Sequence, residues 1–337
     1  MEKRKIQIVD TTMRDGSHAL RHSYTADQVR RIAKALDESK VPFIEVTHGD
    51  GLGGSSYTYG FSKTDEFELL EAANEVITNS KLTVLLLPGI GTIEDLKSAN
   101  RHGAKVVRVA THVTEGDVSA QHIKAAKELD MMAVGFLMMC HMAPPEVIAG
   151  EAKKMESYGA DYINLADSAG YLTPREVVKR IEAVKEAVKI PVGFHAHNNL
   201  GMAVANSLAA VEAGASYIDA TVCGLGAGAG NTQIEVLAAV LQRESIETGL
   251  DLYGLMDLAK DIVKPMMLRP QEIDTGSLML GYTGVYSSFL LHVYHAAEKY
   301  HIEPRDILIE LGKRKMVGGQ EDMIIDVAYQ LKMSAGR

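Results

Sequence analysis

Cysteine is scarce in this sequence. The 337 residues include only two cysteines, Cys140 and Cys223. Two cysteines do not imply a disulfide framework, so this scarcity favours a reducing, cytoplasmic location. The N-terminal segment "MEKRKIQIVD" is basic, but its apolar run is too short for a signal peptide.

Long apolar runs and an excess of positive charge are also missing. The longest nearly apolar stretch, "MMAVGFLMMC" at 131–140, is too short to span a bilayer. The formal net charge of -9 argues against a general nucleic-acid binder, which normally needs a basic surface. We therefore expect no membrane and no nucleic acid among the partners. The hydrophobic content of 46% and the charged content of 23% are ordinary for a globular protein.

Short apolar runs rich in β-branched residues alternate with helix-like segments along most of the chain. Continuous apolar runs of this kind are typical of strands in a buried parallel sheet. The helix-like segments, such as 25–39 and 173–188, carry apolar residues at three-and-four spacing, and Thr25 and Thr173 are suitable N-caps. The predicted strands are 5–10, 43–47, 82–87, 105–111, 132–139, 162–167, 192–197 and 217–222.

The number and order of these units predict an α/β fold. Eight βα units within about 240 residues match a (β/α)8 TIM barrel. An open doubly wound sheet is the alternative, but such a sheet usually carries fewer strands. After residue 245 the pattern becomes helical without a clear strand. The expected domains are a TIM-barrel catalytic domain at 1–245 and a helical C-terminal domain at 246–337.

Polar residues gather where the predicted strands end. Barrel enzymes hold their active sites at these C-terminal strand ends and in the loops that follow. One of the polar segments is rich in glycine and long enough to act as a lid. The segments are "DTTMRDGSH" (10–18), "HGDGLGGSSYTYG" (48–60), "NLADSAG" (164–170), "GFHAHNN" (193–199) and "CGLGAGAGN" (223–231).

Two histidines stand two residues apart on the seventh predicted strand. Because a strand sends alternate side chains to one face, His195 and His197 point the same way. A carboxylate from segment 10–18 can meet them across the barrel mouth. One carboxylate and two imidazoles with open positions form a catalytic pattern for Mn²⁺, Fe²⁺ or Zn²⁺. The alternative is a pair of ordinary histidines without a metal.

Two other polar features receive supporting roles. Asp10 is expected to hold the Arg14 loop by hydrogen bonds. Residues 224–229 fit a dinucleotide-binding glycine pattern, but the acidic residue that should follow on a second strand is missing. We interpret that loop as close backbone packing at the barrel mouth, with Asn231 a candidate for the surroundings of the metal.

Several motifs in this order resemble a known superfamily. "DTTMRDG" followed much later by "HAHN" resembles the DRE-TIM metallolyases, which include hydroxymethylglutaryl-CoA lyase and isopropylmalate synthase. Within that superfamily the chain is similar to the 4-hydroxy-2-oxovalerate aldolase family, and the match covers essentially the whole chain. The motifs that carry it are "TMRDGSHALRH", "HGDGLGGSSYTYG", "FLMMCHMAP", "GLGAGAGN" and "TGVYSSFLLH".

The resemblance implies a set of site residues. Asp15, His195 and His197 would bind Mn²⁺, or another divalent ion such as Mg²⁺ or Co²⁺. The predicted catalytic residues are Arg14 beside the developing enolate oxygen, His18 as the base for the C4 hydroxyl, and Tyr286 on the aldehyde side. The predicted substrate-binding residues are Arg14, Asp15, Ser168, His195 and Tyr286.

The resemblance also implies an activity and a partner. The activity is a class II pyruvate aldolase of aromatic hydrocarbon catabolism, cleaving 4-hydroxy-2-oxopentanoate to pyruvate and acetaldehyde through a metal-stabilised pyruvate enolate. The partner is an acylating acetaldehyde dehydrogenase in a heterotetramer that channels the aldehyde. In the C-terminal segment Phe289, Leu290, Val293 and Ala297 form either a docking face or a core face.

Two other functions stay open at this point. One is an acyl-CoA-using lyase or condensing enzyme of the same superfamily, although the glycine loop here lacks the cysteine of the lyase. The other is a non-catalytic scaffold subunit of a dehydrogenase complex. The presence of Arg14, Asp15, His18 and both histidines of "HAH" argues against a scaffold.

Overall fold

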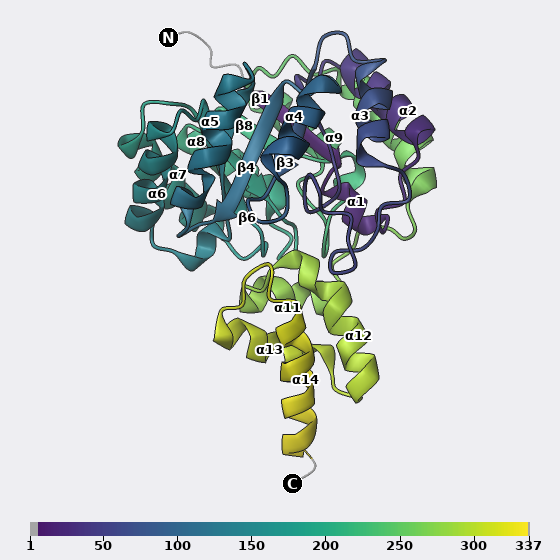
Figure 1. Cartoon of the computed structure of the whole chain (residues 1–337), viewed down its shortest axis with the longest axis vertical. Helices are drawn as coiled ribbons and strands as arrows, with labels where there is room; N and C mark the ends of the chain where they lie inside the picture. Colours follow the sequence, from purple (N-terminus) through teal and green to yellow (C-terminus); the bar gives the residue numbers. More distant parts are fainter. Residues whose placement is uncertain (1–5, 336–337) are drawn as a thin grey trace.

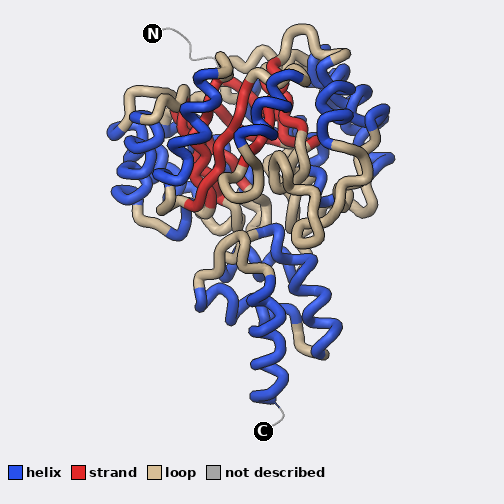
Figure 2. Tube along the Cα trace, in the orientation of Figure 1, coloured by secondary structure: helices blue, strands red, loops and turns tan. Residues whose placement is uncertain are grey.

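The computed structural model describes residues 6–335, and the predictions that reach into residues 1–5 and 336–337 lie outside this part of the chain. Within the described residues, parallel strands close into a barrel in the order β1 to β8, so the open doubly wound sheet is excluded (Figures 1 and 2). The predicted (β/α)8 fold is confirmed. The strands are β1 Gln7–Met13, β2 Phe43–Val46, β3 Lys81–Leu86, β4 Val106–His112, β5 Met132–Met138, β6 Tyr162–Asp167, β7 Val192–Ala196 and β8 Tyr217–Ala220.

Helices follow the strands and cover the outside of the barrel (Figure 2). In α2 the predicted cap forms: the Gln28 main-chain N donates to Thr25 Oγ1, and the Thr25 main-chain N donates to Gln28 Oε1. The apolar residues on the buried face of this helix, such as Ile32 and Leu36, belong to the main hydrophobic cluster of the barrel. The barrel helices are α1 Gly16–Ala19, α2 Ala26–Glu38, α3 Glu66–Asn74, α4 Ile93–Arg101, α5 Ala120–Glu128, α6 Pro145–Ser157, α7 Pro174–Ala187, α8 Ala203–Ala213 and α9 Ile234–Arg243.

The barrel interior has a polar layer between two apolar layers. One apolar cluster includes Val9 and Phe43, and the other includes Phe136 and Ala166. Between them the strands contribute buried charged and amide side chains instead of aliphatic ones. These are Glu45, Arg108, Asn164 and Asp219, none of them more than 1% exposed. The C-terminal side of this polar layer is where an active site of this fold is expected.

The chain after the barrel forms two kinds of structure. Helix α10, Leu252–Asp257, and the helical turns at 258–266 pack on the barrel, because Leu255, Leu258 and Val263 belong to its main hydrophobic cluster. A separate core is then built by α11 Thr275–Thr283, α12 Leu290–Tyr300, α13 Pro304–Arg314 and α14 Asp322–Ala335. The predicted division at 245/246 stays a prediction.

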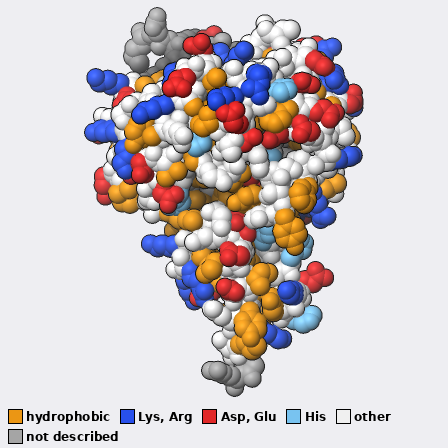
Figure 3. Space-filling view, viewed as in Figure 1, with side chains coloured by type: hydrophobic (Ala, Val, Ile, Leu, Met, Phe, Trp, Pro, Cys, Tyr) orange, Lys and Arg blue, Asp and Glu red, His pale blue; other side chains and the backbone are white. Residues whose placement is uncertain are grey.

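The helical C-terminal part projects from one end of the barrel (Figure 1). Phe289, Leu290, Val293 and Ala297 lie inside its core, so the core alternative of the two predicted faces is the one observed. Acidic and basic side chains are interspersed over the face shown in Figure 3. In the described residues, none of the helices combines the length and the apolar character needed to cross a membrane.

Candidate active site

Asp15, His195 and His197 converge at the C-terminal end of the barrel, as the sequence predicts. His195 Nε2 lies 3.3 Å from Asp15 Oδ2 and 3.3 Å from His197 Nε2, and His197 Nε2 lies 3.6 Å from Asp15 Oδ2. Donor atoms bound at about 2.1 Å to one ion lie about 3.0 to 3.4 Å apart at octahedral or tetrahedral angles. The two edges of 3.3 Å fall in this range and the edge of 3.6 Å is slightly wider, so the triangle fits one divalent cation after a small inward shift of the side chains.

The Nδ1 atoms of the two histidines form hydrogen bonds that fix the orientation of the rings. His195 Nδ1 is 2.9 Å from Asp219 Oδ2, and His197 Nδ1 is 3.3 Å from the Ala227 carbonyl oxygen. Both partners accept a hydrogen bond, so each Nδ1 is the donor. In the neutral ring each Nε2 then carries the lone pair that can bind a metal ion. This arrangement is typical of histidine ligands, whose second nitrogen is held by a carboxylate or a carbonyl.

The electrostatics of the three residues suit a cation. Burial acts to raise the pKa of Asp15, but Arg14 and the two histidines hold that pKa well below its usual range. Burial lowers the pKa of His197 to about 4, so its imidazole is neutral near pH 7. Burial acts to lower the pKa of His195, but its hydrogen bonds to Asp15 and Asp219 raise that pKa. A charged carboxylate and neutral imidazoles are the protonation states that bind metal ions, so His195 must lose its Nε2 proton when an ion binds.

Arg14 lies beside the metal-binding triangle. Its Nε donates to Glu45 Oε2 over 2.7 Å, and its Nη1 donates to Asp15 Oδ2 over 2.9 Å. Its Nη2 is buried and has no hydrogen-bond partner among the described residues. A fixed guanidinium with one unpaired N–H group can donate to an oxyanion, which is the role predicted for Arg14.

A chain of buried charged residues in the polar layer of the barrel holds Arg14 and His195 in place. The sequence analysis did not predict this chain. Glu45 accepts from Arg14 and, over 2.6 Å, from both Nε and Nη2 of Arg108. Arg108 Nη1 and His195 Nδ1 both bond Asp219. The available signal was a single charge inside each apolar run, in "FIEV", "VVRV" and "YIDA".

His18 lies near the triangle but outside the inner cavity. Its ring packs on Gly49 so closely that a Cβ there would be 2.5 Å from His18 Nε2. Burial lowers the pKa of His18, while the nearby Asp15 acts to raise it. The ring lines a neighbouring surface pocket of about 200 Å³ together with Ala227 and Arg21.

Ser168 and Tyr286 both line the small cavity that contains the metal-binding triangle. The Ser168 hydroxyl accepts from the Met139 main-chain N over 3.0 Å. The Ser168 carbonyl oxygen accepts from Ser287 Oγ over 2.7 Å, which ties the C-terminal part to the barrel. Ser287 follows Tyr286 directly, so this contact fixes the tyrosine at the cavity.

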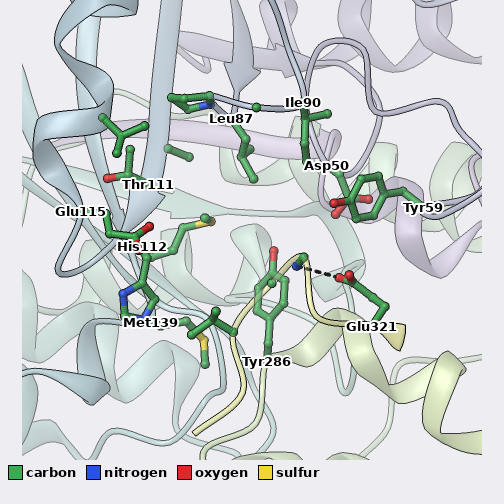
Figure 4. Close-up of a pocket in the computed structure, with 18 residues that line it drawn as sticks. Asp50, Tyr59, Leu87, Ile90, Thr111, His112, Glu115, Met139, Tyr286 and Glu321 are labelled. Carbon is green, nitrogen blue, oxygen red and sulfur yellow. Dashed lines mark hydrogen bonds between the residues drawn. The ribbon is translucent and has the colours of Figure 1, made fainter. Parts of the chain in front are cut away.

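A larger pocket of about 290 Å³ adjoins the inner cavity (Figure 4). Asp50, Leu87, Met138 and Tyr286 line both spaces, so these residues form their boundary. In Figure 4 the Tyr286 side chain rises from the C-terminal part, whereas Asp50 and Tyr59 come from the loop after β2. The inner cavity is small, about 20 Å³, so the adjoining pocket provides most of the space beside the metal-binding triangle.

One supporting residue differs from the sequence predictions, and another stays untested. Asp10 does not hold the Arg14 loop: its carboxylate accepts from the main-chain N and the hydroxyl of Thr12, which is closer in the chain. The amide nitrogen of Asn231 donates to the Leu225 carbonyl oxygen, and its buried Oδ1 has no hydrogen-bond partner among the described residues. Its place in the surroundings of the metal stays a prediction. The glycine loop is packed as predicted, because a Cβ on Gly226 would be 2.6 Å from the amide of Asn231.

Fold and site together define a (β/α)8 enzyme with a candidate divalent-metal centre at the C-terminal strand ends. Two family models match the chain, HMGL-like over residues 5–262 and the DmpG-like communication domain over residues 271–333. The chain therefore belongs to the HMGL-like family. Divalent-metal dependence is a property of this family that the triangle of Asp15, His195 and His197 fits.

Curated relatives match over nearly the full length. A 4-hydroxy-2-oxovalerate aldolase from Moorella thermoacetica is 64% identical and covers 100% of this chain and 99% of the relative. Another from Carboxydothermus hydrogenoformans is 60% identical and covers 97% of this chain and 98% of the relative. Within the family the chain thus groups with the 4-hydroxy-2-oxovalerate aldolases, and the resemblance noted from the motifs is confirmed.

Solved structures agree on the fold. The N-terminal domain of a putative aldolase from Bacteroides vulgatus superposes with a TM-score of 0.72 at 23% identity, covering 85% of this chain and 95% of that one. The carboxyl transferase domain of Rhizobium etli pyruvate carboxylase gives a TM-score of 0.84 at 18% identity, covering 99% of this chain and 61% of that one. At these identities the likeness supports the fold alone.

Proposed function

We propose that the protein is an aldolase that cleaves 4-hydroxy-2-oxopentanoate to pyruvate and acetaldehyde with Mn²⁺ at Asp15, His195 and His197. The observation that carries the proposal is the unpaired Nη2 of Arg14 beside that triangle. Breaking the C3–C4 bond leaves an enolate, whose oxygen needs fixed positive charge. A bound divalent ion supplies such charge as a Lewis acid.

The surrounding residues supply the remaining parts of the reaction. Arg14 donates to the enolate oxygen without a proton to lose. His18 accepts the C4 hydroxyl proton, which suits an imidazole that is neutral near pH 7. The main chain at Ser168 binds the acid end of the substrate, and Tyr286 bounds the side on which the aldehyde leaves.

The C-terminal helical part is the reason to propose a protein partner. A DmpG-like communication domain indicates interaction with a dehydrogenase. We propose that this partner is an acylating acetaldehyde dehydrogenase, that the two form a heterotetramer, and that the aldehyde passes between them. Direct transfer keeps a volatile, reactive product out of solution. We also propose a cytoplasmic location, which the two free cysteines support.

One coupled assay tests the activity. The purified protein is loaded with Mn²⁺ and mixed with 4-hydroxy-2-oxopentanoate, and lactate dehydrogenase reports pyruvate. We expect turnover that disappears with a chelator and returns with Mn²⁺. His197→Ala should lose both Mn²⁺ binding and turnover. Turnover of an acyl-CoA substrate in a parallel assay, together with no pyruvate from 4-hydroxy-2-oxopentanoate, would contradict the proposal.

A further inference from the structure

Asp50 is a buried carboxyl group at the boundary between the inner cavity and the outer pocket. It is 7% exposed and lines both spaces. Its side-chain oxygens receive no hydrogen bond from an N–H or O–H donor of the described residues, although its main-chain N donates to His48 Nδ1 over 3.1 Å. A buried carboxylate without donors is unfavourable, so the neutral acid is stabilised here.

The groups around Asp50 support the same protonation state. Burial raises the pKa of Asp50 to about 7, and Glu321 and Asp15 act in the same direction, whereas His48 and Arg14 oppose it. The carboxyl group can therefore give and take a proton near neutral pH.

Asp50 also has a proton donor beside it. A carboxyl oxygen of Asp50 and ring nitrogens of His18 and His22 all lie within 4.8 Å of one another. His22 is held in place, because its ring stacks on His48 with centroids 3.8 Å apart and its Nδ1 is 3.1 Å from Ser17 Oγ. His48 Nδ1 lies 3.5 Å from Asp50 Oδ2, but it accepts the hydrogen bond of the Asp50 main-chain N and so has no proton to give. His18 is therefore the neighbour that exchanges a proton with Asp50.

We propose that Asp50 is the acid that protonates C3 of the pyruvate enolate, an inference that rests on the proposed aldolase function. His18 takes the C4 hydroxyl proton, the C3–C4 bond breaks, and its electron pair stays on the enolate. Asp50 gives its proton to C3, forming the methyl group, and its carboxylate then takes the proton held by His18. One proton moves from the hydroxyl to C3, and no other reactant is consumed.

The position of the two residues is the reason to assign this step to Asp50 rather than to His18. Asp50 lines the cavity that contains Asp15, His195 and His197, whereas His18 borders that cavity only behind Gly49, where we place the C4 hydroxyl. Asp50 also faces the outer pocket, so its proton exchanges with water there.

The test uses pyruvate alone with the Mn²⁺-loaded protein in D₂O, and proton NMR follows the loss of the methyl signal. Asp50→Asn should slow this exchange at least about 100-fold, the usual contribution of a general acid or base. Asp50→Glu should recover part of it. The matched control is Glu115→Gln, which removes a carboxylate that lines only the outer pocket and should exchange at the wild-type rate.

Several results would overturn the assignment. The first is an exchange rate of Asp50→Asn within about threefold of the wild-type rate. The second is exchange that is lost in His18→Asn but kept in Asp50→Asn. A second Mn²⁺ bound per chain that disappears in Asp50→Asn would make the cluster a metal site instead. As a control for folding, the Mn²⁺ affinity of Asp50→Asn should equal that of the wild type, so that a slower exchange reflects a lost chemical role and not a misfolded protein. Pyruvate release by the wild type tests the proposed function independently.

Discussion

At the scale of single residues, the site depends on charges that neutralise one another inside the barrel. Arg14, Glu45, Arg108 and Asp219 form a continuous chain that ends at His195. Each member has a partner of opposite charge, which offsets the cost of burying it. Changing one member therefore alters the position and the charge balance of the neighbouring member.

The first prediction concerns the shape of Arg14. Arg14→Lys keeps the positive charge but replaces three N–H directions, toward Glu45, Asp15 and the cavity, by one point charge. We expect pyruvate release to fall by about 100-fold or more, the usual effect of losing an oxyanion donor. Bound Mn²⁺ measured by atomic absorption should be unchanged. Turnover near the wild-type level would remove Arg14 from the mechanism.

The second prediction concerns the partner of His195. Asp219→Asn keeps the size of the side chain but removes the charge that orients His195 Nδ1. We expect Mn²⁺ affinity measured by calorimetry to fall by about 10- to 100-fold, as for other residues that support metal ligands. Asp257→Asn, in the exposed part of α10, is the control and should leave the affinity unchanged. Equal affinities in the two variants would contradict the supporting role.

These residues also show what sequence can and cannot predict at this scale. His195 and His197 were predictable because the two-residue period of a strand forces them onto one face. The pairing of Arg108 with Asp219 was not, since they are 111 residues apart and meet only inside the closed barrel. Asp50 lay in a predicted lid segment, but nothing in that segment indicates that its carboxyl group is buried.

At the scale of elements, local patterns fixed most boundaries within one or two residues. Strands β6 and β7 lie where their apolar runs predict them. Strand β1 continues to Met13, beyond the predicted end at 10, because the polar residues Thr11 and Thr12 are buried at the barrel mouth. The Thr12 hydroxyl donates to Asp10 and accepts from the Val222 main-chain N, so its polarity does not end the strand.

The third prediction concerns the junction between α2 and β3. Asp37, at the end of α2, accepts hydrogen bonds from main-chain and side-chain donors of Thr78, Asn79 and Ser80. Asp37→Ala leaves several of these donors without a partner and should lower the free energy of unfolding by about 3 kcal/mol. Urea unfolding followed by circular dichroism measures the change. Glu38→Ala, an exposed neighbour on the same helix, is the matched control.

The effect of Asp37 should depend on pH. Burial acts to raise its pKa, but the hydrogen bonds from Ser80, Asn79 and Thr78 hold that pKa well below its usual range. A carboxyl group with a lowered pKa in the folded state stabilises the protein above its unfolded pKa of about 3.9, and this stabilisation is lost as the pH falls further. The stability difference between wild type and Asp37→Ala should thus be full at pH 6 and shrink below pH 4. A difference that stays constant would contradict this origin.

At the scale of the whole molecule, the site is completed by a contact between the barrel and the C-terminal part. Tyr286 reaches the inner cavity from outside the barrel, and Ser287 binds the carbonyl oxygen of Ser168. Helical periodicity predicts the C-terminal helices but not where they dock, because docking depends on a few polar contacts between distant segments. Tyr286 could be predicted only through the family resemblance.

The last prediction tests this contact. Ser287 Oγ donates to the Ser168 carbonyl oxygen over 2.7 Å and accepts from Asn199 Nδ2 over 2.8 Å. Ser287→Ala removes both bonds, and we expect this to weaken the positioning of Tyr286 and Ser168 by about 1.4 kcal/mol. That cost corresponds to a roughly tenfold lower kcat/KM for pyruvate release. The metal ligands do not contact Ser287, so Mn²⁺ affinity should stay unchanged. Ser288→Ala removes a hydroxyl from the adjacent residue, whose side chain lines the neighbouring surface pocket, and should turn over normally. If both variants lose activity equally, or neither does, the docking contact does not position the site.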